Sequence, residues 1–383
     1  MTTAPPAKRR TGQETGTGTD QHTDQHTDPR AKPAAGGPTA QAPSTQANMR
    51  LREIVFGAAA AGAVRAAATL GLPDALDDEA PATPEELAAR LGVQARPLRR
   101  LLQALASHGL FAEAGDGRYE HTEMSRLLRE DTPGSLHHIA LWCTEPWTWQ
   151  VWPRLDQAVR TGDAVFPDVF GKSFFDYLHS EGGESARVFD RAMTSSSRSA
   201  AQDLAAFVDL TGVKSVADIG GGQGFVLAGL LERDASLHGT LLDLPAVVAN
   251  ADPRLRDGGP LADRVRLVPG DVRDAVPVEA DLYIIKNILE WDDASTRALL
   301  GNVVNAAAPG ARVLVIENLV DDSPSMRFTT AMDLLLLLNV GGAKHCKESM
   351  TRLMTEAGLR IGEIRPVNGY LHAFEATVAP AAK

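Results

Sequence analysis

The residues with the most specific chemical potential lie in a glycine-rich stretch, Val216-Ala217-Asp218-Ile219-Gly220-Gly221-Gly222-Gln223-Gly224. Glycines suit a backbone that turns tightly and lets a ligand approach without a Cβ in the way. Such a turn alone could also serve a dinucleotide or a phosphate. However, the spacing is G-G-G-x-G rather than G-x-G-x-x-G, and Asp218 would repel a pyrophosphate. We therefore expect a cationic ligand beside Asp218, Gly220 and Gly222.

Two further acidic residues follow the next two predicted strands. Asp243 ends the run His238–Asp243, where a carboxylate can accept hydrogen bonds from both hydroxyls of a ribose. Asp271 follows Val265–Pro269, where it can accept a hydrogen bond from the exocyclic amine of adenine. Three acidic residues at successive strand ends, together with the glycine turn, predict S-adenosylmethionine as the cofactor, since its sulfonium and amino group are both cationic.

The elements that must position these residues alternate between short β-branched runs and helices from about Val213 onward. This alternation predicts an α/β domain with a doubly wound parallel sheet, similar to a Rossmann fold. The predicted strands are 214–218, 238–243, 265–269, 280–286 and 311–317, and the predicted helices are 225–233, 244–251 and 294–308.

The chain before this domain divides into two further parts. Residues 1–48 contain almost no large apolar side chains and are rich in Thr, Gln, Pro, Ala and Gly, a composition typical of a disordered tail. Residues 49–205 are predicted to form a helical domain, and residues 206–383 the cofactor domain. Within the helical domain, Thr83-Pro84 begins one helix, Pro97 to Gly109 forms another, and a turn at Gly115-Asp116-Gly117 closes a small β-wing.

This winged-helix outline has two interpretations. Arg96, Arg99 and Arg100 would suit a DNA-reading helix, and the chain would then be a regulator that senses S-adenosylmethionine. The formal net charge of -11 argues against a nucleic-acid partner, because non-specific affinity comes from clustered Lys and Arg. We therefore favour a dimerisation and substrate-capping role.

Composition narrows the class of protein further. The balance of 44% hydrophobic and 23% charged residues is that of a globular protein, and no apolar run approaches the length of a membrane span. Two cysteines, Cys143 and Cys346, fit a reducing cytoplasm. No metal site is expected. Residues 134–205 hold four of the five tryptophans, including Trp142, and a minority of these aromatic side chains would line a cleft for a flat substrate.

From about Met49 to its end, the chain resembles the bacterial secondary-metabolite branch of the class I small-molecule O-methyltransferases, relatives of the plant phenolic and the anthracycline methyltransferases. The residues that carry the resemblance are Asp218-Ile219-Gly220-Gly221-Gly222, Leu242-Asp243-Leu244-Pro245, Gly270-Asp271, Tyr283-Ile284-Ile285-Lys286, Leu314-Val315-Ile316-Glu317, and Asp333 through Gly341-Gly342. The resemblance implies a homodimer and a small aromatic substrate.

The resemblance also implies roles for individual residues. Cofactor contacts are expected from Asp218, Gly220, Gly222, Asp243, Leu244, Gly270, Asp271, Val272, Lys286 and Ser197. The substrate pocket is expected to include Trp142, Met193, Asn287 and Asn339.

The catalytic segment departs from the family pattern. Family members have a histidine base after Lys-x-x-Leu, whereas this chain reads Lys286-Asn287-Ile288-Leu289-Glu290-Trp291, one residue shorter and without histidine. The family's later glutamate, which orients that base, aligns with Lys344, while the strand-end Glu317 is retained. Glu290 could replace the base if burial raises its pKa, His345 could serve from the other side of the pocket, or no base is needed and the enzyme orients an acidic phenol or enol. Glu290 could also be an ordinary surface residue.

The missing histidine leaves the acceptor atom open. Methylation of an acidic hydroxyl is the favoured reaction. C-methylation of an electron-rich aromatic or enol carbon is the main alternative, because such a carbon can attack before it loses its proton. A relative that binds the cofactor but catalyses other chemistry is a further alternative.

Overall fold

The computed structural model describes residues 44–180, 183–321, 323 and 325–380. By its internal contacts the chain divides into residues 1–54 and 55–383, and each part is described by itself. The first part holds most of α1 (Thr45–Val55), an amphiphilic helix with no buried residue. The predicted disordered tail over 1–48 therefore lies outside the described residues except at its end, where Thr45 begins this helix.

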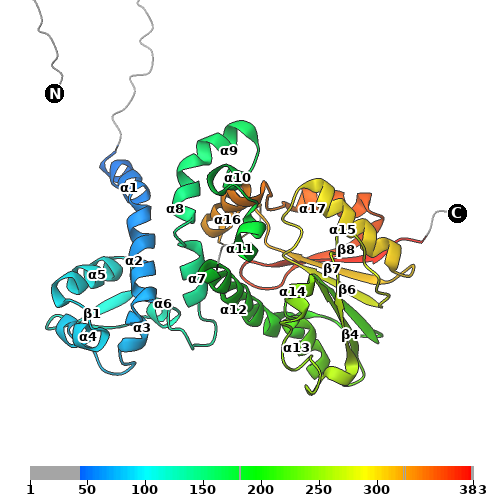
Figure 1. Cartoon of the computed structure of the whole chain (residues 1–383), viewed down its shortest axis with the longest axis horizontal. Helices are drawn as coiled ribbons and strands as arrows, with labels where there is room; N and C mark the ends of the chain where they lie inside the picture. The colour runs from blue at the N-terminus through cyan, green and yellow to red at the C-terminus, as the bar shows by residue number, and fades with distance from the viewer. Residues whose placement is uncertain (1–43, 181–182, 322, 324, 381–383) are drawn as a thin grey trace, which may run out of the picture. The chain divides into compact units, whose positions relative to one another are not determined.

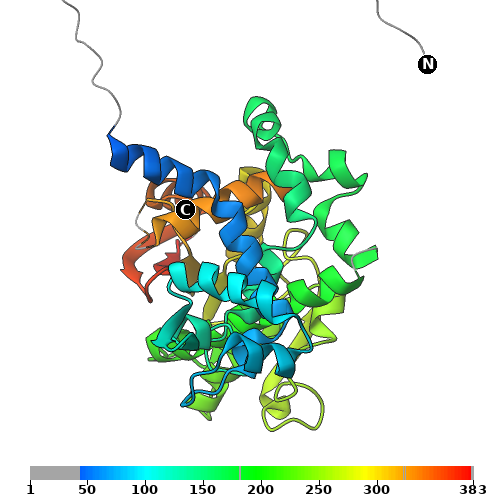
Figure 2. The ribbon, with the colours of Figure 1, turned by 90° about the vertical axis from the view of Figure 1, so that its left-hand side faces the viewer.

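Short helices and a two-stranded sheet open the second part. Thr83 caps α4 by a reciprocal pair of hydrogen bonds, from Glu86 N to its hydroxyl and from its own N–H to the Glu86 carboxylate. β1 and β2 pair antiparallel with Phe111 opposite His121, as the predicted wing requires. In Figure 2 these segments, coloured blue to cyan, face the viewer. The elements are α2 (Gly57–Thr69), α3 (Leu72–Ala75), α4 (Pro84–Leu91), α5 (Ala95–Ser107), β1 (Phe111–Gly115), β2 (Arg118–His121) and α6 (Glu123–Arg126).

An aromatic layer follows, built from helices between residues 137 and 207. Trp147, Phe166 and Phe174 are buried and make edge-on ring contacts with one another. They pack together with Leu335 and Leu338 of the later helix α16 (Met326–Val340). The layer comprises α7 (His137–Cys143), α8 (Thr148–Val151), η1 (Trp152–Arg154), α9 (Leu155–Thr161), α10 (Phe166–Phe170), α11 (Phe174–Ser180) and α12 (Gly183–Phe207).

The remaining residues form a seven-stranded sheet in the order β5-β4-β3-β6-β7-β9-β8. The first five of these strands are parallel, and β9 runs antiparallel to both β7 and β8. The strands are β3 (Ser215–Ile219), β4 (His238–Asp243), β5 (Val265–Pro269), β6 (Leu282–Lys286), β7 (Arg312–Glu317), β8 (Leu359–Pro366) and β9 (His372–Val378). The predicted parallel, doubly wound sheet is confirmed.

Helices cover both faces of this sheet (Figure 1). α15 (Asp293–Ala306) and α17 (Lys347–Glu356) pack on one face, and α12 and α13 (Phe225–Arg233) pack on the other. Residues 244–251 form only the short helix α14 (Pro245–Val248) rather than the full predicted helix. A short 3-10 helix, η2 (Ala262–Arg264), leads into β5. Among the described residues, no helix is both long and apolar enough to span a membrane.

Candidate active site

The candidate cofactor residues gather where the parallel strands end. Asp218 lies in β3, Asp243 ends β4, and Lys286 ends β6, while Asp271 comes two residues after β5. β3 lies between β4 and β6. The chain first adds β4 and β5 on one side of β3 and then β6 and β7 on the other side, so the strand order changes direction at β3. Ligands of open α/β sheets bind at such a switch point, beyond the carboxyl ends of the strands.

The glycine turn after β3 is tied directly to the end of β4. Gly220 and Gly222 both have φ of 63°, a region that residues with a Cβ rarely adopt. The N–H of Gly222 donates to Asp243 Oδ2 at 2.8 Å, and the N–H of Leu244 donates to Oδ1 at 2.7 Å. These two bonds hold the Asp243 carboxylate beside the turn. Burial raises its pKa, and the two backbone donors oppose that shift.

Asp218 belongs to a row of buried charges beneath the turn. Burial raises the pKa of Asp218 to about 7, although the charge of Lys286 opposes the shift. Burial likewise lowers the pKa of Lys286, and it raises that of Glu317 to about 7. The Oδ2 atom of Asp218 is buried and has no hydrogen-bond partner among the described residues. A cationic group bound at the turn would satisfy this oxygen, so the site fits the cofactor predicted from the sequence.

The end of β5 is arranged less simply. Asp271 is engaged by the Arg273 guanidinium at 2.6–3.2 Å, which holds the pKa of the Asp271 carboxyl below its usual range. An adenine amine would therefore share this carboxylate with Arg273. Val272 is buried, whereas Leu244 is 42% exposed.

A cavity of about 300 Å³ lies between the aromatic layer, the segment after β6, and α16. All four residues predicted for the substrate pocket line it, and so does Glu290. Asn287, the first residue after β6, has φ of 52°, an uncommon conformation for a residue with a Cβ that often marks a functional site. The predicted pocket residues that line the cavity are Trp142, Met193, Asn287 and Asn339.

Several lining residues were not expected from the sequence. Ser196 lines the cavity, whereas Ser197, the predicted cofactor contact on the same helix, does not. Lys344 forms an ion pair with Glu290 in the cavity wall, and the two side chains are 6% and 17% exposed. The alignment with the family pointed to position 344, but a lysine there gave no sign of its function. From the aromatic-rich segment 134–205, which was expected to supply a cleft, Phe174, Phe175 and Phe189 line the cavity. The aromatic lining residues that were not expected are Trp291, Phe328 and Tyr370.

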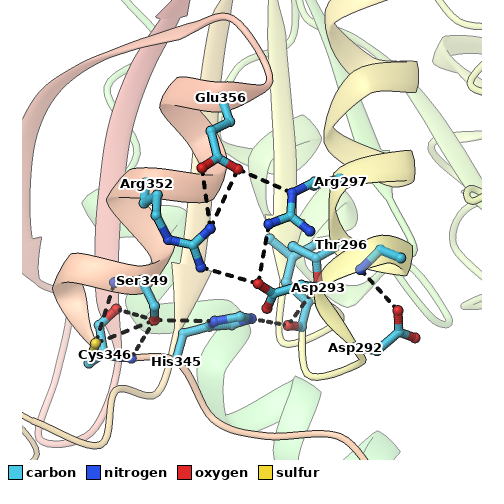
Figure 3. Close-up of polar contacts among 11 residues, drawn as sticks. Asp292, Asp293, Thr296, Arg297, His345, Cys346, Ser349, Arg352 and Glu356 are labelled. Atoms are coloured by element: carbon cyan, nitrogen blue, oxygen red, sulfur yellow. Dashed lines mark hydrogen bonds and ion pairs between the residues drawn. The ribbon is translucent and has the colours of Figure 1, made fainter.

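Two predicted catalytic residues lie outside the cavity lining. The His345 ring is buried, with Nε2 2.7 Å from the Leu289 carbonyl oxygen and Nδ1 3.3 Å from Ser349 Oγ (Figure 3). In the structure the ring faces backbone and a serine and does not line the cavity, so the base role expected for His345 stays a prediction that this position does not support. Glu317 accepts a hydrogen bond from Leu289 N at 3.2 Å. Both residues thus hold the segment that carries Glu290.

No group of three or more His, Cys, Asp or Glu side chains is placed to hold a metal ion within the part of the chain that the structure describes. Cys143 lines the cavity and is not disulfide-bonded, and burial raises the pKa of its thiol to about 11. It is therefore a thiol, not a thiolate, at neutral pH.

Comparison with known proteins agrees with this geometry. A model of the O-methyltransferase domain family matches residues 152–360, and a model of the O-methyltransferase dimerisation domain matches residues 52–131. Mitomycin biosynthesis 6-O-methyltransferase of Streptomyces lavendulae is 37% identical over 82% of this chain and 90% of that protein. O-demethylpuromycin-O-methyltransferase of Streptomyces alboniger is 33% identical over 87% of this chain and 89% of its own length.

A solved structure shows the same fold over nearly the whole described chain. CalO1, a methyltransferase in calicheamicin biosynthesis, superposes in its SAH-bound form with a TM-score of 0.79 and 31% identity. The match covers 88% of this chain and 100% of that one.

Proposed function

The chain belongs to the family of S-adenosylmethionine-dependent O-methyltransferases, and we propose that it methylates a hydroxyl oxygen of a small aromatic or enolic secondary metabolite. The observation that carries this proposal is the continuity of the two sites along β6. Lys286 ends the strand at the cofactor edge, and the next residue, Asn287, already lines the aromatic cavity. An acceptor in the cavity would therefore lie next to the cofactor.

Each group of cofactor residues would contact a different part of S-adenosylmethionine. Asp243, fixed by two backbone N–H groups, would accept hydrogen bonds from the ribose hydroxyls. Asp271 and the buried Val272 would hold the adenine, and Asp218 would face the cationic amino-acid end. Gly220, Gly222, Gly270, Leu244 and Ser197 would border the ligand. When bound, S-adenosylmethionine supplies an electrophilic methyl group on a positively charged sulfur.

Glu290 is proposed as the group that takes the acceptor's proton. Its side chain is largely buried and lines the cavity beside aromatic residues, so it lies within reach of an acceptor bound there. Its backbone is held from two sides, since the residue before it donates its N–H to Glu317 and offers its carbonyl to His345. A catalytic group that is already held in position loses less entropy when the transition state forms, which favours a faster reaction.

Two further properties are proposed. The match to a dimerisation domain over 52–131 supports a homodimer, and Phe56, 70% exposed within that range, would be covered in such an assembly. Two cysteines without a disulfide, Cys143 and Cys346, support a reducing cytoplasm as the location.

The proposal is tested by incubating the protein with methyl-labelled S-adenosylmethionine and a panel of phenols, catechols, enols and hydroxyquinones. A product whose mass rises by one methyl group supports the proposal. C-methylation is the second candidate, favoured by the absence of a histidine between Lys286 and Trp291. If the cofactor binds but no acceptor in the panel is methylated, the proposed function is contradicted.

A further inference from the structure

The charged pair of Glu290 and Lys344 is the least expected feature of the cavity. Both side chains line it, and the Lys344 side chain is only 6% exposed. Taking two charges out of water costs several kcal/mol per ion, and their mutual attraction offsets this only in part. An aromatic pocket meant only to hold a neutral ring would be built more simply from apolar residues of the same volume. The pair therefore points to an interaction with the acceptor.

Lys344 has unused hydrogen-bonding capacity. An ammonium carries three N–H donors. Within the described part of the chain, Glu290 is the acceptor that Lys344 Nζ contacts, and no other acceptor is within reach. Asp333 accepts a hydrogen bond at 2.6 Å from the backbone N–H of Lys344, so Oδ1 of its carboxylate is used by the backbone. Donors of the ammonium thus remain for a ligand in the cavity.

Burial disfavours the charged form of Lys344, and a ligand anion beside it would oppose that effect. Burial lowers the pKa of Lys344 to about 7, and the positive charge of Lys286 adds to that shift. Lys286 has Asp218 and Glu317 as its own acidic neighbours. In the cavity lining itself, the charged side chains are Lys344 and Glu290. An anionic oxygen next to Lys344 would favour its charged form.

Resting on the proposed function, we propose that Lys344 is a catalytic residue whose ammonium binds the acceptor hydroxyl as an oxyanion. The acceptor O–H bond breaks, its electron pair stays on oxygen, and its proton passes to the Glu290 carboxylate. The oxyanion, held by Lys344, then forms a bond to the methyl carbon as the carbon–sulfur bond breaks and its electron pair stays on sulfur. Electrostatic stabilisation of the oxyanion by Lys344 lowers the pKa of the acceptor hydroxyl, so a weak base such as a carboxylate is sufficient to remove its proton.

This role also defines a class of acceptor. Stabilisation by one ammonium suits a hydroxyl that is already acidic, such as one conjugated to a carbonyl on an aromatic or quinonoid ring. Trp142 lines the same cavity, and its buried Nε1 has no partner among the described residues, so a carbonyl oxygen that reached it would accept its hydrogen bond. We therefore expect acidic hydroxycarbonyl aromatics to be preferred over simple phenols.

The test measures the ionisation state of a bound chromophore. 4-Nitrophenol and 4-nitro-1-naphthol absorb differently as phenols and as phenolates, and each is titrated into the full-length protein with S-adenosylhomocysteine present. We expect at least one probe to bind saturably and its pKa to fall by about one unit or more, which is about a tenfold rise in the ratio of ionised to neutral probe. A bound probe that stays neutral, or no saturable binding of either probe, overturns the proposal.

Variants separate this role from a structural one. Lys344→Met should abolish the shift in probe pKa, Lys344→Arg should keep most of it, and Glu290→Gln should keep it while turnover falls. The double variant Lys344→Met with Glu290→Gln removes the charge pair without leaving a lone buried charge, and it should also lack the shift. Lys214→Met, at an exposed lysine outside the cavity lining, is the matched control. An unchanged shift in the double variant overturns the proposal.

These outcomes are distinct from failure of the proposed function. If the wild-type protein transfers methyl groups but the bound probe stays neutral, the proposed role of Lys344 is contradicted and the methyltransferase function is still supported. If the bound probe is ionised but no acceptor is methylated, the proposed function is contradicted, whereas the anion-binding site at Lys344 is supported.

Discussion

The Nε2 atom of His345 lies 2.7 Å from the carbonyl oxygen of Leu289, the residue immediately before Glu290 (Figure 3). Because a carbonyl can only accept, the Nε2 atom carries the proton. Burial lowers the pKa of His345, so the ring is neutral at neutral pH. His345 therefore fixes the backbone that presents Glu290 to the cavity, and it is a positioning residue.

This relationship predicts a rate effect without a binding effect. In His345→Ala the Leu289 carbonyl loses its donor, and we expect kcat to fall about tenfold while KM for the acceptor changes little. His345→Gln keeps an N–H donor and should recover a large part of the rate. Steady-state kinetics of the two variants test this. Equal loss in both variants, or a change confined to KM, would contradict the positioning role.

Close backbone packing predicts a second effect on the same segment. A Cβ added to Gly342 would collide with the carbonyl of Glu290, and backbone cannot move aside as a flexible side chain can. Gly342→Ala should lower the free energy of unfolding by about 1–3 kcal/mol and displace Glu290, reducing turnover.

The matched control is Gly301→Ala. Gly301 lies in α15, where an added Cβ meets no atom within 4 Å. The control should be stabilised by about 0.5–1 kcal/mol, because alanine is the better helix former. Denaturant unfolding of both proteins gives the comparison. If the Gly342→Ala protein is as stable and active as the control, the packing of Gly342 against the Glu290 carbonyl is not tight.

Cofactor affinity should depend on Asp243. Replacing it with alanine removes the partner of the Gly222 and Leu244 N–H groups as well as the proposed acceptor for the ribose. We expect the Kd for S-adenosylhomocysteine to rise at least about tenfold, roughly 1.4 kcal/mol. Titration calorimetry measures it, with Asp257→Ala at an exposed position as control. The same loss in both variants would mean that Asp243 has no specific role.

Buried Asp218 predicts a pH dependence of cofactor binding. Its pKa is raised to about 7 by burial, so around pH 6 most of the ligand-free protein carries it protonated. A cationic ligand favours the carboxylate and lowers that pKa. Binding of S-adenosylmethionine near pH 6 should therefore release up to about one proton, and affinity should rise from about pH 5 to about pH 8.

Calorimetry in buffers of different ionisation enthalpy counts the released protons. Asp218→Asn should abolish the release that belongs to this group and flatten the rise in affinity with pH. If the wild-type protein and the variant release the same number of protons, another group titrates and Asp218 does not face the ligand's charge.

The same carboxyl group has a consequence for stability. Since its folded pKa lies above the ordinary value of 3.8, it contributes stability at low pH that is lost as pH rises through about 7. In the ligand-free protein, Asp218→Asn should therefore raise the unfolding free energy near pH 8 more than near pH 5. Denaturant unfolding at the two pH values checks this. Equal changes at both would show that Asp218 ionises as freely in the folded chain as in the unfolded one.

The sheet and its strand-end residues could be predicted from sequence because those signals are local. β4 and β5 match the predicted runs residue for residue, since β-branched patterns and terminal acidic residues lie in consecutive positions. The predicted helix over Phe225–Arg233 likewise matches α13. The chirality and order of a parallel sheet then follow from general rules of chain connection.

The catalytic end was harder because its contacts join distant segments. Glu290 and Lys344 meet across 54 positions, and His345 reaches Leu289 across 56. A side chain's direction decides which of two adjacent residues enters the cavity, and no periodic pattern fixes that direction between β6 and α15. Ser196 and Ser197 point in different directions from helix α12, and only the packing of that helix decides which of them lines the cavity. The Arg273 partner of Asp271 was missed although it lies only two residues away, because the spacing does not show how the two side chains turn.

The most direct test of the central claim is the atom to which the methyl group is attached. The protein is incubated with carbon-13 methyl-labelled S-adenosylmethionine and hydroxycarbonyl aromatics, and the products are examined by NMR. The account predicts a methoxy signal that is lost in Lys344→Met and largely retained in Lys344→Arg. A methyl signal bonded to ring carbon would contradict oxygen as the acceptor, and a methoxy product formed equally well by Lys344→Met would contradict the oxyanion site.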